Sequence, residues 1–305
     1  MKLNYLCIAI AFFIFSCYGQ TKNPTISSAE EAANILESQE TNPLLSLPQP
    51  TIMEAFPFEG HTLDFETEPT PKLQMISKKQ NQITDTEKWF DENQLSLPTY
   101  TVYNEYQDIQ GNIPASIPLN YEGFRITNGF YYETCDIFFY GPNYSDKRFM
   151  LITNKTHDKI LHFLDFGKFA YAPQNLEEDK AYVFQSINWA VIEDGILYVS
   201  HGHDTYAKSS FGKNAYISAI DLENYATIWT TEPLTCNSTF TVVGNAIICG
   251  YGFTQEPDYL FVVDRFTGAH RQILDLATGP DYVIQKENQV FVRTYNQDYV
   301  FLIER

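Results

Sequence analysis

The chain has 305 residues, of which 44% are hydrophobic, and it carries a formal net charge of −18. This length and composition allow one or two domains with buried cores. A surface this acidic repels phosphate backbones, which argues against nucleic acid as a partner, and it favours solubility. The 21 tyrosines and 23 phenylalanines favour pleated sheet.

Residues 1–20 have the pattern of an export signal, with an apolar run from Leu6 to Phe15 that is too short to span a bilayer. Residues 14–17 (IFSC) resemble a bacterial lipobox, in which Cys17 becomes the lipidated first residue. The alternative is ordinary signal-peptidase cleavage near Gly19. We therefore predict an exported protein. It is either an outer-membrane lipoprotein facing the periplasm or the cell surface, or a soluble secreted or periplasmic protein.

Residues 21–97 lack a strand period and are rich in Pro, Glu, Gln, Ser and Thr. This composition is typical of a largely disordered tether that holds a domain away from a membrane. Short helices are expected after the capping-box pattern at residues 28–31 and at residues 84–92. Trp89 is expected to pack against the folded domain rather than bind a ligand. The predicted domain boundary lies at residue 98.

Residues 98–305 alternate between short β-rich runs and turns. A four-strand unit occurs in two clear copies within these residues. Its first turn is Asp194-Gly195 in one copy and Gly244-Asn245 in the next, and its third run ends on Asp221 or Asp264. The two aspartates are separated by one period of a four-stranded propeller blade, roughly 40 to 45 residues.

Two further copies complete the count. Asn128-Gly129 is a strong hairpin signal and predicts an earlier copy, followed by an insertion at residues 166–180. The last copy has three strands, and residues 99–106 (TYTVYNEY) form a spare one. A propeller closes when one terminus completes the blade begun by the other. We therefore expect an all-β propeller of four blades, each of four antiparallel strands, closed by this N-terminal strand; five blades is the alternative.

The turn after the third run resembles that of the PQQ-like (quinoprotein-type) β-propeller repeat family, A-x-D-x-x-T-G-x-x-x-W. The chain echoes it at residues 219–221, followed by Trp229, and at residues 264–268 (DRFTG). The resemblance implies that the aspartate caps a tight turn, the glycine adopts a positive φ and the tryptophan wedges between blades. It covers roughly residues 121–305 and implies the fold. It implies no activity, because the fold hosts many functions.

One face of such a propeller collects the loops between second and third strands and the links between blades. Aromatic, carboxylate and histidine residues gather in these loops, whereas the opposite face has only short hairpins. The predicted ligand-binding residues are Tyr140, His201, His203, Asp204, Tyr206, Tyr251, Phe253, Glu256, Asp258 and Tyr295. Aromatic rings beside glycines suit stacking on sugar faces, and packing between blades is the alternative for the same rings.

His201-x-His203 is the sharpest local pattern. Alternation along a strand places both imidazoles on one side, as a metal site requires, with Asp204 or Glu256 as an oxygen ligand. The alternative is two loop histidines that are hydrogen-bonded to carboxylates or backbone. Asp204 with Glu256 is also a candidate acid–base pair. The sequence contains no nucleophile elbow, phosphate loop or dinucleotide fingerprint.

Export processing leaves Cys135, Cys236 and Cys249, whose spacing matches no zinc signature. We expect them to be small buried hydrophobes. A bridge between Cys236 and Cys249 is disfavoured, because the hairpin register around residues 244–245 places Phe240 opposite Cys249.

Two functions fit these features. The first is a non-catalytic, exported binding or scaffold module of the bacterial cell envelope, a monomer without a cofactor. It would use one propeller face for an envelope protein or a small ligand such as a glycan. The alternative is a metal-dependent enzyme that acts on glycans or peptides at His201 and His203. A PQQ-dependent dehydrogenase is disfavoured, because those enzymes use about eight blades, a vicinal cysteine pair and a calcium site.

The lipobox predicts how the protein fractionates. Replacement of Cys17 by alanine removes the residue that would carry the lipid, so the Cys17→Ala protein should leave the membrane fraction on cell lysis. Immunoblots of membrane and soluble fractions measure this. An unchanged distribution between the two fractions would contradict the lipobox, and a protein that is soluble with and without the substitution would favour cleavage near Gly19.

Overall fold

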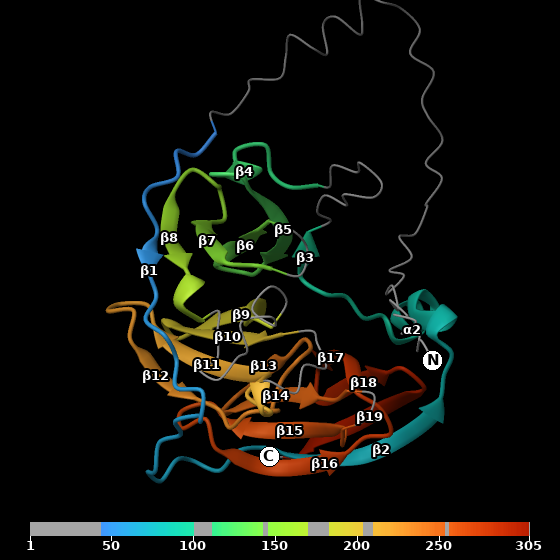
Figure 1. Ribbon diagram of the computed structural model, residues 1–305. Coiled ribbons are helices and arrows are strands. Elements are labelled where there is room, and N and C mark those ends of the chain that lie inside the picture. Colours follow the sequence, from blue (N-terminus) through green and yellow to red (C-terminus); the bar gives the residue numbers. More distant parts are fainter. Residues whose placement is uncertain are drawn as a thin grey trace, which may run out of the picture. The chain divides into compact units, whose positions relative to one another are not determined.

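The computed structural model of the protein describes residues 44–100, 112–142, 146–169, 183–203, 210–253 and 256–304. In these ranges the regular structure is almost all β and falls into four sheets (Figure 1). Helical structure there consists of α2 (Thr86–Asn93) and two 3-10 turns, η1 (Ile83–Asp85) and η2 (Gly167–Phe169). None of the described helices has the length and apolar character that a membrane crossing needs.

The sheets follow one another along the chain, and the predicted all-β fold of four-stranded units is confirmed for the described residues. The second sheet contains β9 (Ser186–Glu193), β10 (Ile196–Gly202), β11 (Tyr216–Asp221) and β12 (Thr227–Thr230). The third contains β13 (Thr241–Val243), β14 (Ala246–Tyr251), β15 (Tyr259–Asp264) and β16 (His270–Asp275). The first contains β5 (Phe124–Tyr131), β6 (Cys135–Gly141), β7 (Phe149–Asn154) and β8 (Ile160–Asp165), with β1 (Thr51–Ile52), β3 (Thr99–Tyr100) and β4 (Asn120–Tyr121) added. The fourth contains β17 (Pro280–Lys286), β18 (Gln289–Thr294), β19 (Gln297–Glu304) and β2 (Lys72–Gln80).

The turn after β15 has the structure that its sequence implies. The Asp264 carboxylate accepts hydrogen bonds from the backbone amides of Phe266 and Thr267 at 2.9 and 3.1 Å, and Gly268 has a φ of +76°. Trp229 of the second sheet packs against Gly268 so closely that a Cβ there would lie 2.7 Å from the indole. All three implied roles are therefore confirmed: an aspartate cap, a left-handed glycine and a tryptophan wedged between sheets.

The predicted hairpin at Asn128-Gly129 is wrong. Both residues lie inside β5, and the chain turns later, so that Tyr131 pairs with Asp136. Gly129 has no side chain and so allows β3 to approach β5 closely. It pairs with Tyr100 of β3, and a Cβ on Gly129 would lie 3.2 Å from the Tyr100 side chain. The glycine is therefore explained by cross-strand packing rather than by a turn.

The predicted closing strand is also wrong. Tyr100 belongs to β3 and pairs with β5 in the first sheet, while residues 101–106 lie outside the described residues. The fourth sheet is completed by β2, which pairs antiparallel with β19 from Gln80 opposite Gln297 to Lys72 opposite Glu304. The folded part of the chain thus includes residues that the sequence analysis assigned to a tether before residue 98. The helix expected around Trp89 is confirmed as α2, with Trp89 buried against the fourth sheet.

Residues 51–80, here called the perimeter segment, contact the outer strand or turn of every sheet. β1 pairs with β8 of the first sheet, and His61 exchanges two backbone hydrogen bonds with Thr230 of β12. Leu63 donates its amide to the Thr267 carbonyl in the third sheet, and the segment then becomes β2 of the fourth. It therefore covers strand edges that would otherwise expose unpaired backbone groups.

Apolar clusters show which sheets pack on which. One cluster joins the first, second and third sheets, and another joins the third and fourth. The alternation within β14 makes this possible, because Ile247 and Cys249 belong to the former cluster and Ala246 and Ile248 to the latter. The remaining faces of the first and fourth sheets have their own coverings. Residues 113–124 lie on the first sheet and α2 on the fourth.

The β2–β19 pairing predicts a matched pair of substitutions on one strand. Leu73 is 4% exposed in the fourth-sheet core, whereas Met75 on the same strand is 53% exposed. Leu73→Ala should lower the free energy of unfolding by roughly 2 to 4 kcal/mol, because it leaves a cavity, and Met75→Ala should change it by less than about 0.5 kcal/mol. Urea unfolding followed by tyrosine and tryptophan fluorescence measures both. Equal effects would contradict the placement of β2.

Candidate functional site

His201 lies inside the protein rather than on a binding face. Its side chain is fully buried, and its ring packs against Phe56, Phe169 and Tyr216, with ring centroids 4.3 to 5.4 Å away. Nε2 lies 2.9 Å from the Ser218 hydroxyl. Burial lowers its pKa to about 3, so the ring is neutral at physiological pH. The ring is therefore a packed, hydrogen-bonded core group and is not presented to solvent.

The rest of the predicted metal site is only partly described. His203 is 5% exposed, and its backbone exchanges hydrogen bonds with the Asn214 side chain at 2.7 and 2.9 Å. The predicted residues Asp204 and Tyr206 lie outside the described residues. Among the side chains that the structure does describe, no group of three or more His, Cys, Asp or Glu is arranged to hold a metal ion.

The loop after β14 brings several other predicted residues together. The buried Tyr251 hydroxyl donates to the Glu256 carboxylate, and Asp258 lies close enough to Glu256 to be influenced by its charge. Burial, followed by the Glu256 charge, raises the pKa of Asp258. Phe253 in the same loop is half-buried. These contacts are made within the loop, because the Tyr251 hydroxyl is already hydrogen-bonded to Glu256.

The two remaining predicted residues lie in different surroundings. Tyr140 belongs to the cluster on the face of the first sheet that points away from the second, and its hydroxyl donates to the Pro118 carbonyl at 2.8 Å. Tyr295 is 61% exposed and follows β18 in the fourth sheet. The packing therefore separates Tyr140 from His201 and Tyr251, which lie with the cluster between the first three sheets.

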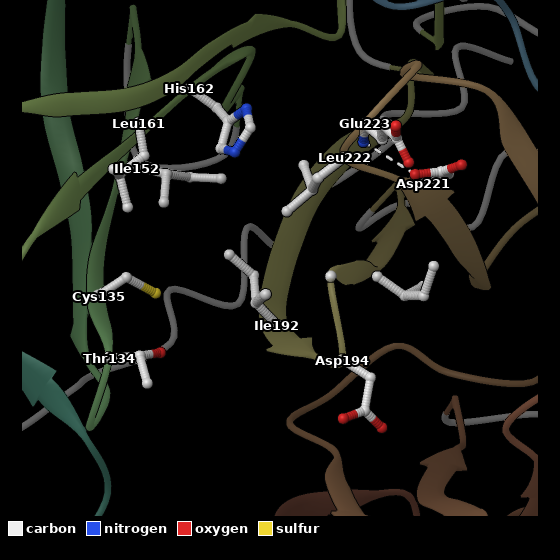
Figure 2. Close-up of a pocket in the computed structure, with 12 residues that line it drawn as sticks. Thr134, Cys135, Ile152, Leu161, His162, Ile192, Asp194, Asp221, Leu222 and Glu223 are labelled. Atoms are coloured by element: carbon white, nitrogen blue, oxygen red, sulfur yellow. Dashed lines mark hydrogen bonds between the residues drawn. The ribbon is translucent and has the colours of Figure 1, made fainter.

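A cleft of about 450 Å³ opens between the first and second sheets, at the hairpin ends of their strands (Figure 2). Apolar side chains face one another across it. Its lining residues are Thr134, Cys135, Ile152, Leu161 and His162 from the first sheet and Ile192, Asp194, Gly195, Ile196, Asp221, Leu222 and Glu223 from the second. The cleft lies among the short hairpins, on the side of the sheets where the sequence analysis placed no site.

The rim of the cleft on the side of the second sheet is acidic. Asp194 has a side chain 73% exposed and pairs at 2.8 Å with Arg265 of the third sheet. Asp221 accepts hydrogen bonds from the Glu223 amide at 2.8 Å and from the Asn224 side chain at 2.7 Å, so it mainly caps its own turn. The Glu223 side chain is exposed. The cleft therefore combines an apolar interior with negative charge along one rim.

The turn beside the cleft carries local backbone strain. Tyr225 occupies the position of Gly268 in the next copy and has a φ of +63°, a conformation that costs a non-glycine residue roughly 1 kcal/mol or more. Its hydroxyl lies 3.1 Å from Nδ1 of His162 in the first sheet. Burial lowers the pKa of His162, which favours its neutral ring in this contact. Tyr225 thus links the two sheets at the edge of the cleft.

One difference between the two sequence copies indicates this site. The turn of the third sheet begins Asp264-Arg265 and ends in Gly268, whereas the corresponding turn of the second begins Asp221-Leu222 and ends in Tyr225. An apolar residue and a large aromatic ring thus replace a charge and a glycine at a surface turn. Comparison of the two copies at these positions would have indicated this end of the second sheet.

No family model matches the chain, and no curated protein sequence matches it. Solved structures that resemble it include the computationally designed Ika8 protein (10% identity, 59% of this chain and 46% of that one, TM-score 0.38). They also include BamB from Moraxella catarrhalis (10%, 55% and 56%, 0.31) and the WD40 β-propeller domain of Doa1 (13%, 60% and 52%, 0.38). The matched region spans about half the length of each of these structures.

Acidification should destabilise the fold through His201. Its pKa is about 3 in the folded protein and near 6.5 when exposed. Below pH 6.5 the unfolded state therefore binds more protons than the folded state, and the free energy of unfolding falls as the pH drops from 6.5 towards 3. Between pH 7 and pH 5 this group alone should remove about 2 kcal/mol.

Urea unfolding of the His201→Gln variant at the two pH values tests this. Glutamine retains a hydrogen-bonding group for Ser218 but cannot be protonated, so the loss on acidification should be about 2 kcal/mol smaller than in the unsubstituted protein. His61→Gln, which changes an exposed side chain, is the matched control and should keep the full loss. An equal loss in all three proteins would contradict the burial of a neutral His201.

Proposed function

We propose that this protein is a non-catalytic, exported binding module and that the cleft between its first and second sheets receives a segment of a partner protein of the cell envelope. The observation that carries the proposal is the cleft itself, with apolar side chains on both walls and carboxylates on one rim. Its volume suits a few side chains rather than a folded domain. An extended segment with aliphatic residues next to lysine or arginine fits this chemistry.

The apolar walls supply the affinity in this proposal. Leu161 is 39% exposed on β8, and Ile192 and Ile196 face it from the hairpin of β9 and β10. Burial of one aliphatic side chain between such walls contributes roughly 1.5 to 3 kcal/mol. Two or three of them would give a binding free energy that suits a reversible partner, after the costs of association.

The acidic rim supplies the selectivity. Glu223 keeps an exposed carboxylate, Asp194 presents one that is also paired with Arg265, and the chain as a whole carries a net charge of −18. Basic side chains would therefore be attracted to the rim, and acidic ones repelled, more strongly at low salt than at high salt. This favours a basic, aliphatic segment over a neutral or acidic glycan, which offers neither positive charge nor aliphatic side chains.

The setting and the ring architecture belong to the same proposal. The lipobox at Cys17 would anchor the protein to a membrane, with the acidic domain free to meet partners. The four sheets would be blades of a four-bladed propeller. Leu97, which packs against both the main cluster and the cluster around Trp89, would link the last blade to the first.

A matched pair of variants tests the cleft. Leu161 and Ile273 are exposed aliphatic residues on the fourth strands of the first and third sheets, and only Leu161 lines the cleft. Binding of a fluorescent peptide of alternating leucine and lysine residues is measured by anisotropy. Leu161→Glu should weaken it at least tenfold, which corresponds to about 1.4 kcal/mol, because a carboxylate would enter the apolar wall.

Ile273→Glu adds the same charge elsewhere and should leave the affinity unchanged. A peptide with glutamate in place of lysine should not bind. Equal weakening by the two substitutions would show that the peptide responds only to net charge and would overturn the proposal for the cleft.

A further inference from the structure

Two of the three cysteines lie together in the core. Cys236 and Cys249 are both completely buried in the apolar cluster shared by the first three sheets. Both are free thiols in the structure. Cys249 lies on β14, and Cys236 lies in the loop between β12 and β13. Cys135 is also a buried free thiol, but it belongs to the first sheet and lines the cleft.

The loop between β12 and β13 brings Cys236 towards Cys249, although the two residues are not paired in the strand register. Thr241 pairs with Ile248, so Phe240 falls opposite Cys249 when the register is carried one residue further, as the sequence analysis expected. The preceding residues fold back towards β14, however, after Leu234 adopts a φ of +61°. The Asn237 amide donates to the Gly250 carbonyl at 3.1 Å, beside Cys249.

This path brings Cys236 next to Cys249. The Cys249 thiol lies 3.7 Å from the carbonyl oxygen of Thr235, the residue directly before Cys236. The Cys236 amide is held by the Ala215 carbonyl at 3.1 Å, which fixes that residue between the second and third sheets. The Cys236 thiol lies close enough to the Cys249 thiol to contribute to the raised pKa of Cys249. Two neighbouring buried cysteines, on backbone held by hydrogen bonds on both sides, are suited to disulfide formation.

We propose that Cys236 and Cys249 are joined by a disulfide in the exported protein, and that this bond fastens the loop between the second and third sheets onto β14. Exported compartments are oxidising, so a bridge formed there persists. Cys135 would remain a free thiol, since it lies on β6 of the first sheet, to which neither of the other two cysteines belongs. The proposal is independent of what the cleft binds.

A disulfide-bearing oxidoreductase would oxidise the two cysteine thiols. One cysteine thiolate attacks the disulfide of the oxidoreductase and forms a mixed disulfide, which releases one thiolate of that protein. The second cysteine thiolate then attacks the mixed disulfide, forms the Cys236–Cys249 bond and releases the other. Two electrons pass to the oxidoreductase, which becomes a dithiol, and the two cysteine protons pass to solvent and to the released thiolates.

The exchange must precede complete folding. Both sulfur atoms have no solvent exposure once the sheets are packed. Burial, reinforced by the neighbouring Cys236 thiol, also raises the pKa of Cys249 and suppresses its thiolate. The bond is therefore expected to resist reductants in the folded protein and to become reducible on unfolding.

Alkylation mapping of the full chain, exported to a bacterial periplasm, tests the proposal. The purified protein is unfolded in guanidinium with N-ethylmaleimide, digested and analysed by mass spectrometry, with and without prior reduction. Without reduction, Cys135 should carry the label, and Cys236 and Cys249 should appear as one linked pair of peptides. Labelling of both Cys236 and Cys249 without reduction would overturn the proposal.

Single serine variants give a second, independent readout. In Cys236→Ser the Cys249 thiol loses its partner and should be labelled without reduction, and the converse should hold for Cys249→Ser. Reductant should lower the midpoint of urea unfolding in the unsubstituted protein and in the Cys135→Ser control, and it should have no effect in the Cys236→Ser/Cys249→Ser double variant. A midpoint that does not respond to reductant in the Cys135→Ser control would contradict the bond.

Discussion

The fourth sheet depends on a strand from the other end of the chain, and this pairing constrains most of the structure. β19 would be an exposed edge without β2, since the C-terminal copy supplies three strands only. To reach that edge, the chain first passes the outer strands or turns of the other sheets. The perimeter segment therefore contacts the outer strand or turn of the other sheets and supplies the fourth strand of the last one, which covers edges that would otherwise be free.

The packing between sheets follows from strands that are apolar on both faces. β6, β14 and β15 bury nearly every residue, and successive side chains enter different clusters. Such strands have no solvent-facing side, so each inner sheet needs a neighbour on both faces. The end sheets obtain their second neighbour from other elements: α2, through Trp89, covers the fourth, and residues 113–124 cover the first. Because α2 and β2 pack on or pair with the fourth sheet, the folded part of the chain begins well before residue 98, within the residues that were expected to form a tether.

The parts predictable from sequence are those encoded by local chemistry. The turns at residues 194–195 and 244–245, the aspartate cap at Asp264 and the wedge at Trp229 each depend on a few adjacent residues, and the structure contains all of them. β2 was missed because its nine residues (KLQMISKKQ) bury only Leu73 and show no alternation. Its strand conformation comes from its partner β19. The sequence around Tyr100 alternates more regularly and therefore predicts a closing strand, although Tyr100 pairs with the first sheet.

The candidate site could not be predicted in the same way, because its geometry is set by contacts between sheets. His201 and His203 alternate as a strand metal site would, but the aromatic rings that enclose His201 come from Phe56 and Phe169, far away in the sequence. The cleft is formed by hairpin residues that look unremarkable one at a time. Only the comparison of Leu222 and Tyr225 with the equivalent turn in the next copy marks them as unusual.

Native-state amide hydrogen exchange of the full chain tests the central pairing most directly, since it reports on each strand without any substitution. If β2 is the fourth strand of the last sheet, the amides of residues 73–79 that face β19 should exchange as slowly as those of β18, and the two strands should lose protection together as urea is added. Exchange of the whole 72–80 segment at the rate of an unstructured peptide, while β18 and β19 stay protected, would contradict the account.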